Sequence, residues 1–304
     1  MILVTGGHGF LGRSVVRQLG DRPHLAPTHG ELDLLDAAAV GRYLKVNAVR
    51  AVIHAAGYVG GIGLHRSEPG RVALENLLMG VNVLQAASRL DLAIHVVIVS
   101  TVCAYPEFAP IPTPERSLYD GYPAADTAPY GLAKRQLHSL AGALAKEGGL
   151  TSSYVIPTNL YGPGDHFDES RSHVVPALIR RSYEARRDGA KEMVIWGDGT
   201  ATRDLLYVDD CARGLVAAMD ASAARSEVVN LSVGEEVSIR RLAETIRDRV
   251  GFDGVLVWDP TKPQGAPRRA LDPAKARSLL DFLPRVALDE GLARTVDWYV
   301  NSQR

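Results

Sequence analysis

Short, nearly continuous apolar runs alternate with segments of helical periodicity along the first 160 residues. The apolar runs at 2–5, 24–27, 51–56, 94–99 and 152–160 have the length of buried strands, and helix-like patterns occur around 15–19, at 77–90 and at 130–145. Parallel strands that are covered by helices on both faces are apolar along their whole length. The pattern predicts an α/β fold with a Rossmann-type, doubly wound parallel sheet.

The pattern changes after Gly162, where a polar loop precedes a helix-like run at 174–185 and a strand with a turn at 192–204. A short strand and a helix follow at 205–220, and we expect Asp209 and Asp210 to cap this helix. We therefore predict a dinucleotide-binding domain at 1–165, joined by about 204–232. Residues 166–203 and 233–304 then form a smaller α/β lobe that binds the substrate.

Composition narrows the class of partner. The 304 residues are 46% apolar and carry 34 basic and 35 acidic side chains, so the net charge of -1 favours neither nucleic acid nor a membrane surface. No apolar run has the roughly 18 residues of a membrane helix, and the first strand begins at once, so we expect a cytoplasmic protein. Cys103 and Cys211 have neither metal-site nor disulfide spacing, so no metal is expected.

A glycine pattern follows the first apolar run. Gly6, Gly9 and Gly12 are spaced three apart where a strand passes into a helix that opens with Phe10 and Leu11. Such glycines permit a tight turn and a close backbone approach to a pyrophosphate at the helix N-terminus. The strand, the helix and the glycine spacing together predict a binding site for a nicotinamide dinucleotide.

The choice between NAD and NADP depends on the segment after the second strand. An acid there favours NAD and an arginine favours NADP, whereas this chain has Thr28 and His29, with Glu31 beyond. Thr28, His29 and His8 could hold a 2′-phosphate, which favours NADP(H) over NAD(H). They could equally be surface residues of turns.

Tyr130 and Lys134 form an i, i+4 pair in a helix-like segment. A phenol is a poor proton donor at neutral pH, and a nearby ammonium favours its ionised form, so the pair suits proton transfer to a sugar oxygen. The same spacing occurs by chance in many helices. Its position after the glycine pattern and the stretch STVCAYP strengthens the catalytic interpretation.

With these motifs in order, the chain resembles the extended short-chain dehydrogenase/reductases that act on nucleotide sugars. Within them it is most similar to the GDP-L-fucose synthase family, which epimerises GDP-4-keto-6-deoxymannose at C3 and C5 and then reduces C4. The shared stretches cover most of the chain and include ELDLLD, CAYP, APYGLAK, PTNLYGPGDHF, SHVVPALIRR, WGDGT, TRDLLYVDD and KPQGAPR.

The resemblance implies that Thr101, Tyr130 and Lys134 form the group for hydride transfer, and that Cys103 and His173 are the acid/base pair for epimerisation. The chemistry agrees, because the C3 and C5 protons are both α to the C4 ketone and their removal gives an enolate that hydrogen bonds to O4 stabilise. Each residue also has a simpler interpretation, with Cys103 as a small packing residue and His173 as a helix cap.

The resemblance also implies the residues that bind cofactor and substrate. For the cofactor, besides the glycine loop and the Tyr130/Lys134 pair, these are His29, Leu35, Ala55, Ala56, Gly57, Asn76, Pro157, Asn159 and Leu160. For the sugar nucleotide they are Asn159, His173, Arg181, Trp196, Arg203 and Arg269. Arginine suits a diphosphate because its planar fork binds phosphate oxygens bidentately.

Two residues differ from the family pattern. The family commonly has Ser-Ser-Cys where this chain has Thr101, Val102 and Cys103, and Ala104 follows.

The main hypothesis is an epimerase/reductase for a nucleotide-linked 4-keto-6-deoxyhexose. An alternative is an epimerase that retains its NAD without net redox change. A 4,6-dehydratase lacks support because Val102 and Cys103 replace its acid pair, and a non-catalytic sensor would tend to lose Tyr130. A homodimer is expected by analogy alone.

Overall fold

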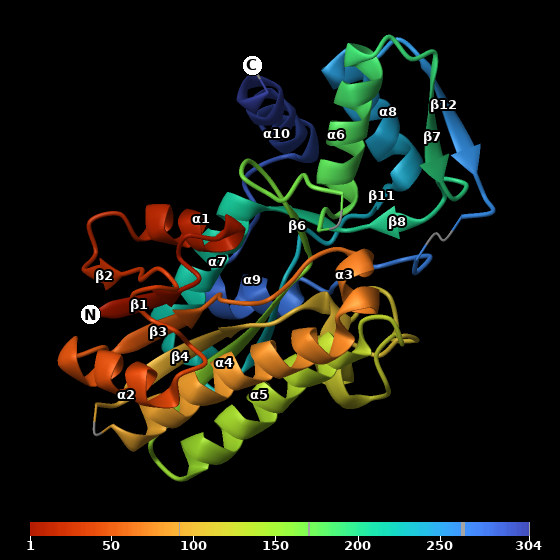
Figure 1. Cartoon of the computed structure of the whole chain (residues 1–304). Helices are drawn as coiled ribbons and strands as arrows, with labels where there is room; N and C mark the ends of the chain where they lie inside the picture. The colour runs from red at the N-terminus through yellow and green to blue at the C-terminus, as the bar shows by residue number, and fades with distance from the viewer. Residues whose placement is uncertain (91, 170, 263–264, 304) are drawn as a thin grey trace.

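The structure is a computed structural model that describes residues 1–90, 92–169, 171–262 and 265–303. At its centre lies a six-stranded sheet in the order β10-β5-β4-β3-β1-β2, in which every neighbouring pair is parallel (Figure 1). This confirms the predicted Rossmann-type sheet. The strands are β1 (Ile2–Thr5), β2 (His24–Leu25), β3 (Ala51–His54), β4 (Ile94–Val99), β5 (Leu150–Pro157) and β10 (Val228–Leu231).

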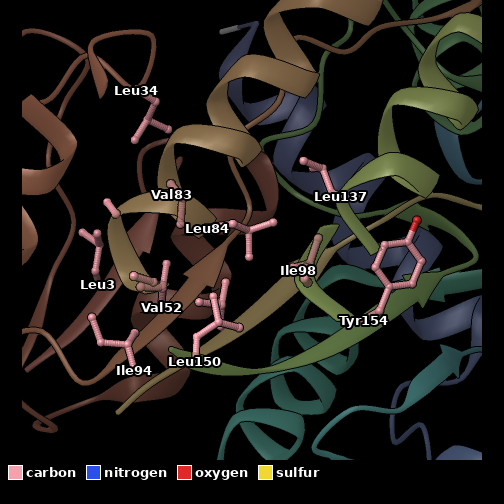
Figure 2. Packing of buried hydrophobic residues seen from close by; sticks show 14 of the residues in the cluster. Leu3, Leu34, Val52, Val83, Leu84, Ile94, Ile98, Leu137, Leu150 and Tyr154 are labelled. Carbon is pink, nitrogen blue, oxygen red and sulfur yellow. The ribbon is translucent and has the colours of Figure 1, made fainter. Parts of the chain in front are cut away.

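Successive residues of the central strands face two different cores, which is why the strands are apolar throughout. Leu3, Val52 and Ile98 pack against helices on one face (Figure 2), whereas Val4 and Ile53 pack on the other. The first face is covered by α2 (Ala37–Val46), α4 (Pro69–Arg89) and α5 (Ala128–Lys146), and the second by α1 (Phe10–Leu19), α7 (Val208–Asp220) and α9 (Ala274–Leu280).

The helix α7 returns the chain to the large sheet, as the sequence predicts, and buries Leu215, Val216 and Met219. It begins at Val208, so Asp209 and Asp210 lie in its first turn and do not cap it, which corrects that expectation. Acidic side chains in a first turn still face the positive end of the helix dipole. The Asp209 carboxylate instead pairs with Arg17 on α1, at 2.7 Å.

A smaller layer covers the C-terminal edge of the sheet (Figure 1). Its core joins three helices and a parallel pair of strands. These are α6 (Val174–Arg187), α8 (Ile239–Val250) and α10 (Leu288–Ser302), with β7 (Glu192–Trp196) and β12 (Val255–Asp259). The helix α9 is not part of this layer, since Ala276 packs with α7, so the predicted second segment of the lobe contains a piece of the larger unit.

Short elements link the two layers. They are β6 (Asn159–Tyr161) paired with β9 (Leu205–Tyr207), and β8 (Thr202–Arg203) paired with β11 (Val237–Ser238). The helix α3 (Ile62–Ser67) lies between the β3 loop and α4. Pro263 and Gln264 of the KPQGAPR stretch lie outside the described residues. Within the described ranges, no helix is long and apolar enough to cross a membrane.

Candidate active site

The glycine loop between β1 and α1 has the geometry of a dinucleotide cradle. Gly6 adopts a φ of 70°, in the left-handed region that favours glycine. A Cβ on Gly12 would lie 1.9 Å from the Gly6 carbonyl oxygen, so only glycine lets the helix begin this close to the turn. Gly9 precedes the first turn that contains Phe10 and Leu11, and no acidic side chain stands in that turn. The free N-terminus of α1 therefore suits a pyrophosphate.

The loop after β3 lies directly against this cradle. A Cβ on Gly6 would come within 2.8 Å of Ala56, which places Ala55, Ala56 and Gly57 beside the glycine turn. The Asn76 amide, 1% exposed, donates to the Tyr58 and Val72 carbonyl oxygens at 2.8 and 2.7 Å. Asn76 thus holds this loop in place with its own polar atoms.

The segment after β2 carries the groups predicted to distinguish NAD from NADP. The His29 side chain is 83% exposed and lies 3.9 Å from the Asp33 carboxylate. The Glu31 carboxylate accepts from the Thr28 amide and hydroxyl at 2.8 and 2.9 Å, so the Thr28 donors are engaged within the turn. His29 and the exposed Leu35 remain open to a ligand, whereas Thr28 does not.

Thr101 and Cys103 are placed by a tight turn at the end of β4. The Thr101 hydroxyl oxygen accepts from the Cys103 amide at 3.1 Å and caps a short 3₁₀ helix, η1 (Val102–Ala104). The Cys103 side chain is half-buried and packs against the cluster of Leu64, Val72 and Tyr130. The thiol is therefore partly accessible beside the predicted proton donor.

The helix α5 brings Tyr130 and Lys134 against this turn. Both residues are buried, and the Lys134 ammonium lies 5.9 Å from the centroid of the Tyr130 ring. A Cβ on Gly131 would lie 2.2 Å from the Cys103 carbonyl oxygen, so the glycine next to Tyr130 lets the helix touch η1. The fold thus gathers Thr101, Cys103, Tyr130 and Lys134 at one place.

Burial dominates the protonation of this pair. Desolvation raises the pKa of the Tyr130 phenol far above its usual value, with a smaller contribution from Cys103. Burial also lowers the pKa of Lys134 to about 8. The cost of burying a phenolate therefore outweighs any attraction between that phenolate and the Lys134 ammonium. Tyr130 is consequently a protonated donor at neutral pH.

His173 ends the polar loop before α6, and its side chain forms no capping bond to the helix. The loop contacts the start of α3, because the Gly61 amide donates to the Arg171 carbonyl oxygen at 2.9 Å. The His65 ring, also on α3, lies tilted against the Tyr130 ring with centroids 5.5 Å apart. His173 is exposed, but desolvation by neighbouring atoms is the largest cause that lowers its pKa, and the nearby His65 and His166 lower it further.

A cavity of about 220 Å³ lies between α6, β7 and β8. Arg181, Trp196 and Arg203 all line it, so the structure brings together three predicted substrate residues from separate elements. Burial, followed by the charge of Arg269, lowers the pKa of Arg203 to about 10. Two guanidinium groups that repel each other beside a cavity favour an anionic ligand such as a diphosphate.

Arg269 connects this charged region with the thiol, because its guanidinium lies 3.7 Å from the Cys103 sulfur. Asn159 follows the end of β5, and its amide donates to the Asp204 carbonyl oxygen at 3.1 Å. Pro157 and Leu160 flank it at the same strand end. The predicted residues therefore lie at the C-terminal edge of the sheet, where ligands of doubly wound folds bind.

Comparison with known proteins identifies the family. Residues 2–232 match the NAD dependent epimerase/dehydratase family. The chain belongs to that family. It is 38% identical over 304 residues to the probable GDP-L-fucose synthase 1 of Oryza sativa subsp. japonica, covering 99% of this chain and 92% of the other. Identity to the GDP-L-fucose synthase of Escherichia coli (strain K12) is 34% over 316 residues, covering 99% and 97%.

A solved structure agrees with these relatives. The GDP-L-fucose synthetase of Naegleria fowleri bound to NADP is 29% identical, with a TM-score of 0.89, and the match covers 99% of this chain and 93% of the other. This member of the epimerase/dehydratase family is therefore an NAD(P)-dependent enzyme on an extended Rossmann scaffold.

Sequence reasoning missed two buried residues at the site. His65 lies in a short helix without a recognisable motif, so nothing in the sequence links it to Tyr130. Asp204 stands between Arg203 and the apolar run of β9. An isolated acid inside such a run is a weak sign of a buried carboxylate, because acids are rarely buried without partners.

Proposed function

We propose that this protein converts a GDP-linked 4-keto-6-deoxyhexose by epimerisation at C3 and C5 followed by NADPH-dependent reduction at C4. The observation that carries the proposal is the contact between η1 and α5. The Cys103 side chain packs against the cluster that contains Tyr130, and we assign Cys103 to the α-protons and Tyr130 to proton donation to the ketone. An enzyme that only reduced a ketone would need Tyr130 and Lys134 but no acid/base pair.

The glycine loop fits NADP(H), because Gly12 lets α1 begin directly against the turn at Gly6, which leaves the N-terminus of the helix available to a pyrophosphate. Gly6, Gly9, Gly12, Ala55, Ala56 and Gly57 line the cradle, and His29 and Leu35 are open at its adenosine end. When bound, the nicotinamide supplies the hydride for C4. The NADP-bound relative supports NADPH over NADH.

Epimerisation needs a base on one face of the sugar and an acid on the other. Cys103 and His173 come from separate elements, the end of β4 and the start of α6, so they can approach opposite faces of one ring. Removal of a C3 or C5 proton leaves negative charge on O4, where the Tyr130 phenol and the Thr101 hydroxyl can donate hydrogen bonds.

Reduction then uses the same two hydroxyl groups. The buried Tyr130 phenol is protonated at neutral pH and transfers its proton to O4. Lys134, with a pKa of about 8, is mainly an ammonium at pH 7 and stabilises the phenolate that is left behind. Arg181, Trp196 and Arg203 hold the nucleotide diphosphate in their cavity.

The test is incubation in D₂O with a panel of GDP-, UDP- and dTDP-linked 4-keto-6-deoxyhexoses. NADPH oxidation, deuterium at C3 and C5, and the stereochemistry of the product are followed together. We expect deuterium at both carbons and stoichiometric NADPH oxidation with GDP-4-keto-6-deoxymannose. Purified protein that carries tightly bound NAD and turns over without NADPH would instead establish the redox-neutral epimerase.

We also propose that the enzyme is a homodimer. Leu74 and Leu78 are 57% and 39% exposed, one helical turn apart on α4, and this helix lies beside α5 at the surface (Figure 1). A second copy that covers these side chains is the simplest partner. Light scattering after size exclusion tests this proposal, and a monomer at micromolar concentration contradicts it. A cytoplasmic location stays a prediction.

A further inference from the structure

Asp204 is a carboxylate with no accessible surface, between β8 and β9. Burial raises its pKa to about 6, while the hydrogen bonds it accepts act in the opposite direction. A charge in such a place is costly unless its polar atoms are fully used. Its bonding partners therefore show what the residue holds together.

The side chain of Asp204 joins two distant segments. One carboxylate oxygen contacts the Ser232 hydroxyl and accepts from the Leu271 amide at 3.4 Å. The other oxygen accepts from the Val233 amide at 3.3 Å. The carboxylate thereby fastens the end of β10 to the segment that runs into α9.

The backbone of Asp204 contacts substrate residues directly. Its amide donates to the Arg269 carbonyl oxygen at 2.9 Å. Its carbonyl oxygen accepts from the Thr158 hydroxyl at 3.0 Å and from the Asn159 amide at 3.1 Å. Because Arg203 is its neighbour in the chain, three predicted substrate residues depend on where Asp204 lies.

These contacts work against a repulsion. Arg203 lines the cavity and Arg269 reaches the Cys103 sulfur at 3.7 Å, and the charge of Arg269 disfavours that of Arg203. Nothing in their mutual interaction keeps them together before an anion binds. A rigid part of the fold must therefore hold both arginines in position before the anionic substrate binds.

We propose that Asp204 is a positioning residue that holds Arg203 and Arg269 in register between the sugar-nucleotide cavity and Cys103. This inference rests on the proposed function and adds that the epimerisation and reduction groups are held by different parts of the fold. Asp204 supports the side of the site that carries the thiol, whereas Tyr130 and Lys134 are held by α5, to which Asp204 has no hydrogen bond among the described residues. Asp204 therefore acts on substrate binding and epimerisation more than on reduction.

The substitution Asp204→Asn tests this division. It preserves the size of the side chain but turns an NH₂ group toward the Leu271 or Val233 amide. We expect the KM for GDP-4-keto-6-deoxymannose to rise, and deuterium incorporation at C3 and C5 to fall, by about 10- to 100-fold, the usual cost of a small misplacement. Reduction of the already epimerised ketone at saturation should stay within about 2-fold of wild type.

Asp210→Asn is the matched control. Asp210 is also buried and accepts from the Arg285 and Val286 amides, both at 2.9 Å, so it too fastens a distant segment, but away from the cavity. It should lower the melting temperature without changing the ratio of epimerisation to reduction. If Asp204→Asn does not fold, Ser232→Ala removes a single donor and should shift the ratio in the same direction.

The outcomes separate the two proposals. Wild-type protein that exchanges no C3 or C5 protons with any substrate of the panel contradicts the proposed function itself. Wild-type exchange together with an equal loss of epimerisation and reduction in Asp204→Asn, or in Ser232→Ala where that variant replaces it, overturns the role of Asp204. So does an unchanged KM, or the same shift of ratio in Asp210→Asn.

Discussion

Burial moves both members of the Tyr130 and Lys134 pair toward their neutral forms. The pKa of the phenol rises and that of the ammonium falls to about 8, because each charged form loses hydration in the same apolar surroundings. A phenol that resists ionisation suits the donation of a proton to O4. In the proposed mechanism the tyrosine acts as an acid, and it releases its proton only when a stronger base, the reduced sugar oxygen, forms beside it.

Cys103→Ser separates the two chemical steps at the residue scale. A hydroxyl is a much weaker base than a thiolate, so deuterium incorporation at C3 and C5 should fall by about 100-fold or more. Reduction of an already epimerised ketone should survive, because Tyr130 and Lys134 are untouched. Product analysis by NMR measures both steps in one sample.

Tyr130→Phe is the companion variant and should abolish NADPH oxidation, because it removes the proton donor for O4. An equal loss of exchange and reduction in Cys103→Ser would mean that the substitution damages the site as a whole. Unchanged NADPH oxidation in Tyr130→Phe would remove Tyr130 from the mechanism.

At the scale of elements, the site depends on how closely α5 approaches η1. Gly131 is the point of contact, since a Cβ there would lie 2.2 Å from the Cys103 carbonyl oxygen. The sequence shows Tyr130 and Lys134 as one face of a helix, and it shows Cys103 at a strand end. Only the packing of the two elements reveals that Gly131, next to Tyr130, allows α5 and η1 to meet.

We predict that Gly131→Ala lowers both activity and stability. The added methyl group forces α5 away from η1, which separates Tyr130 from Cys103 and costs about 1–3 kcal/mol of unfolding free energy. In the same helix a Cβ on Gly142 meets nothing within 4 Å. Gly142→Ala should therefore stabilise the protein by up to ~1 kcal/mol with unchanged activity.

Urea denaturation and steady-state assays of both glycine variants check this prediction. A Gly131→Ala protein with wild-type kinetics would show that α5 and η1 tolerate separation, and the close contact would then have no catalytic meaning.

For the whole molecule, buried carboxylates link stability to pH. Asp165 is 9% exposed, and burial raises its pKa to about 7, while a bond from the His166 amide acts the other way. An unfolded carboxyl titrates near ~3.9, so the folded state binds the proton more tightly. This contribution to stability is full below about pH 4 and is lost as the pH rises through about 7.

Asp165→Asn should flatten that dependence, because a neutral amide does not titrate. The fall in melting temperature between about pH 5 and about pH 8 should shrink by several degrees, which corresponds to a few kcal/mol. Asp198→Asn is the control, since the bonds from Thr200 lower the pKa of that exposed carboxyl and its loss should act alike at both pH values. A wild-type slope in Asp165→Asn contradicts the prediction.

The sequence alone determined the parallel sheet and the glycine turn and supplied the candidates for the reacting groups, because these depend on local periodicity and on motifs that span a few residues. Tertiary structure decided which groups meet. Cys103 and Arg269 are far apart in the chain and come into contact only because the segment before α9 folds back. The role of Asp204 likewise depends on its hydrogen bonds to three segments that are distant in the chain, at 158–159, 232–233 and 269–271. The protonation of Tyr130 and Lys134 was also decided there, since desolvation depends on every atom packed around a group and on no motif.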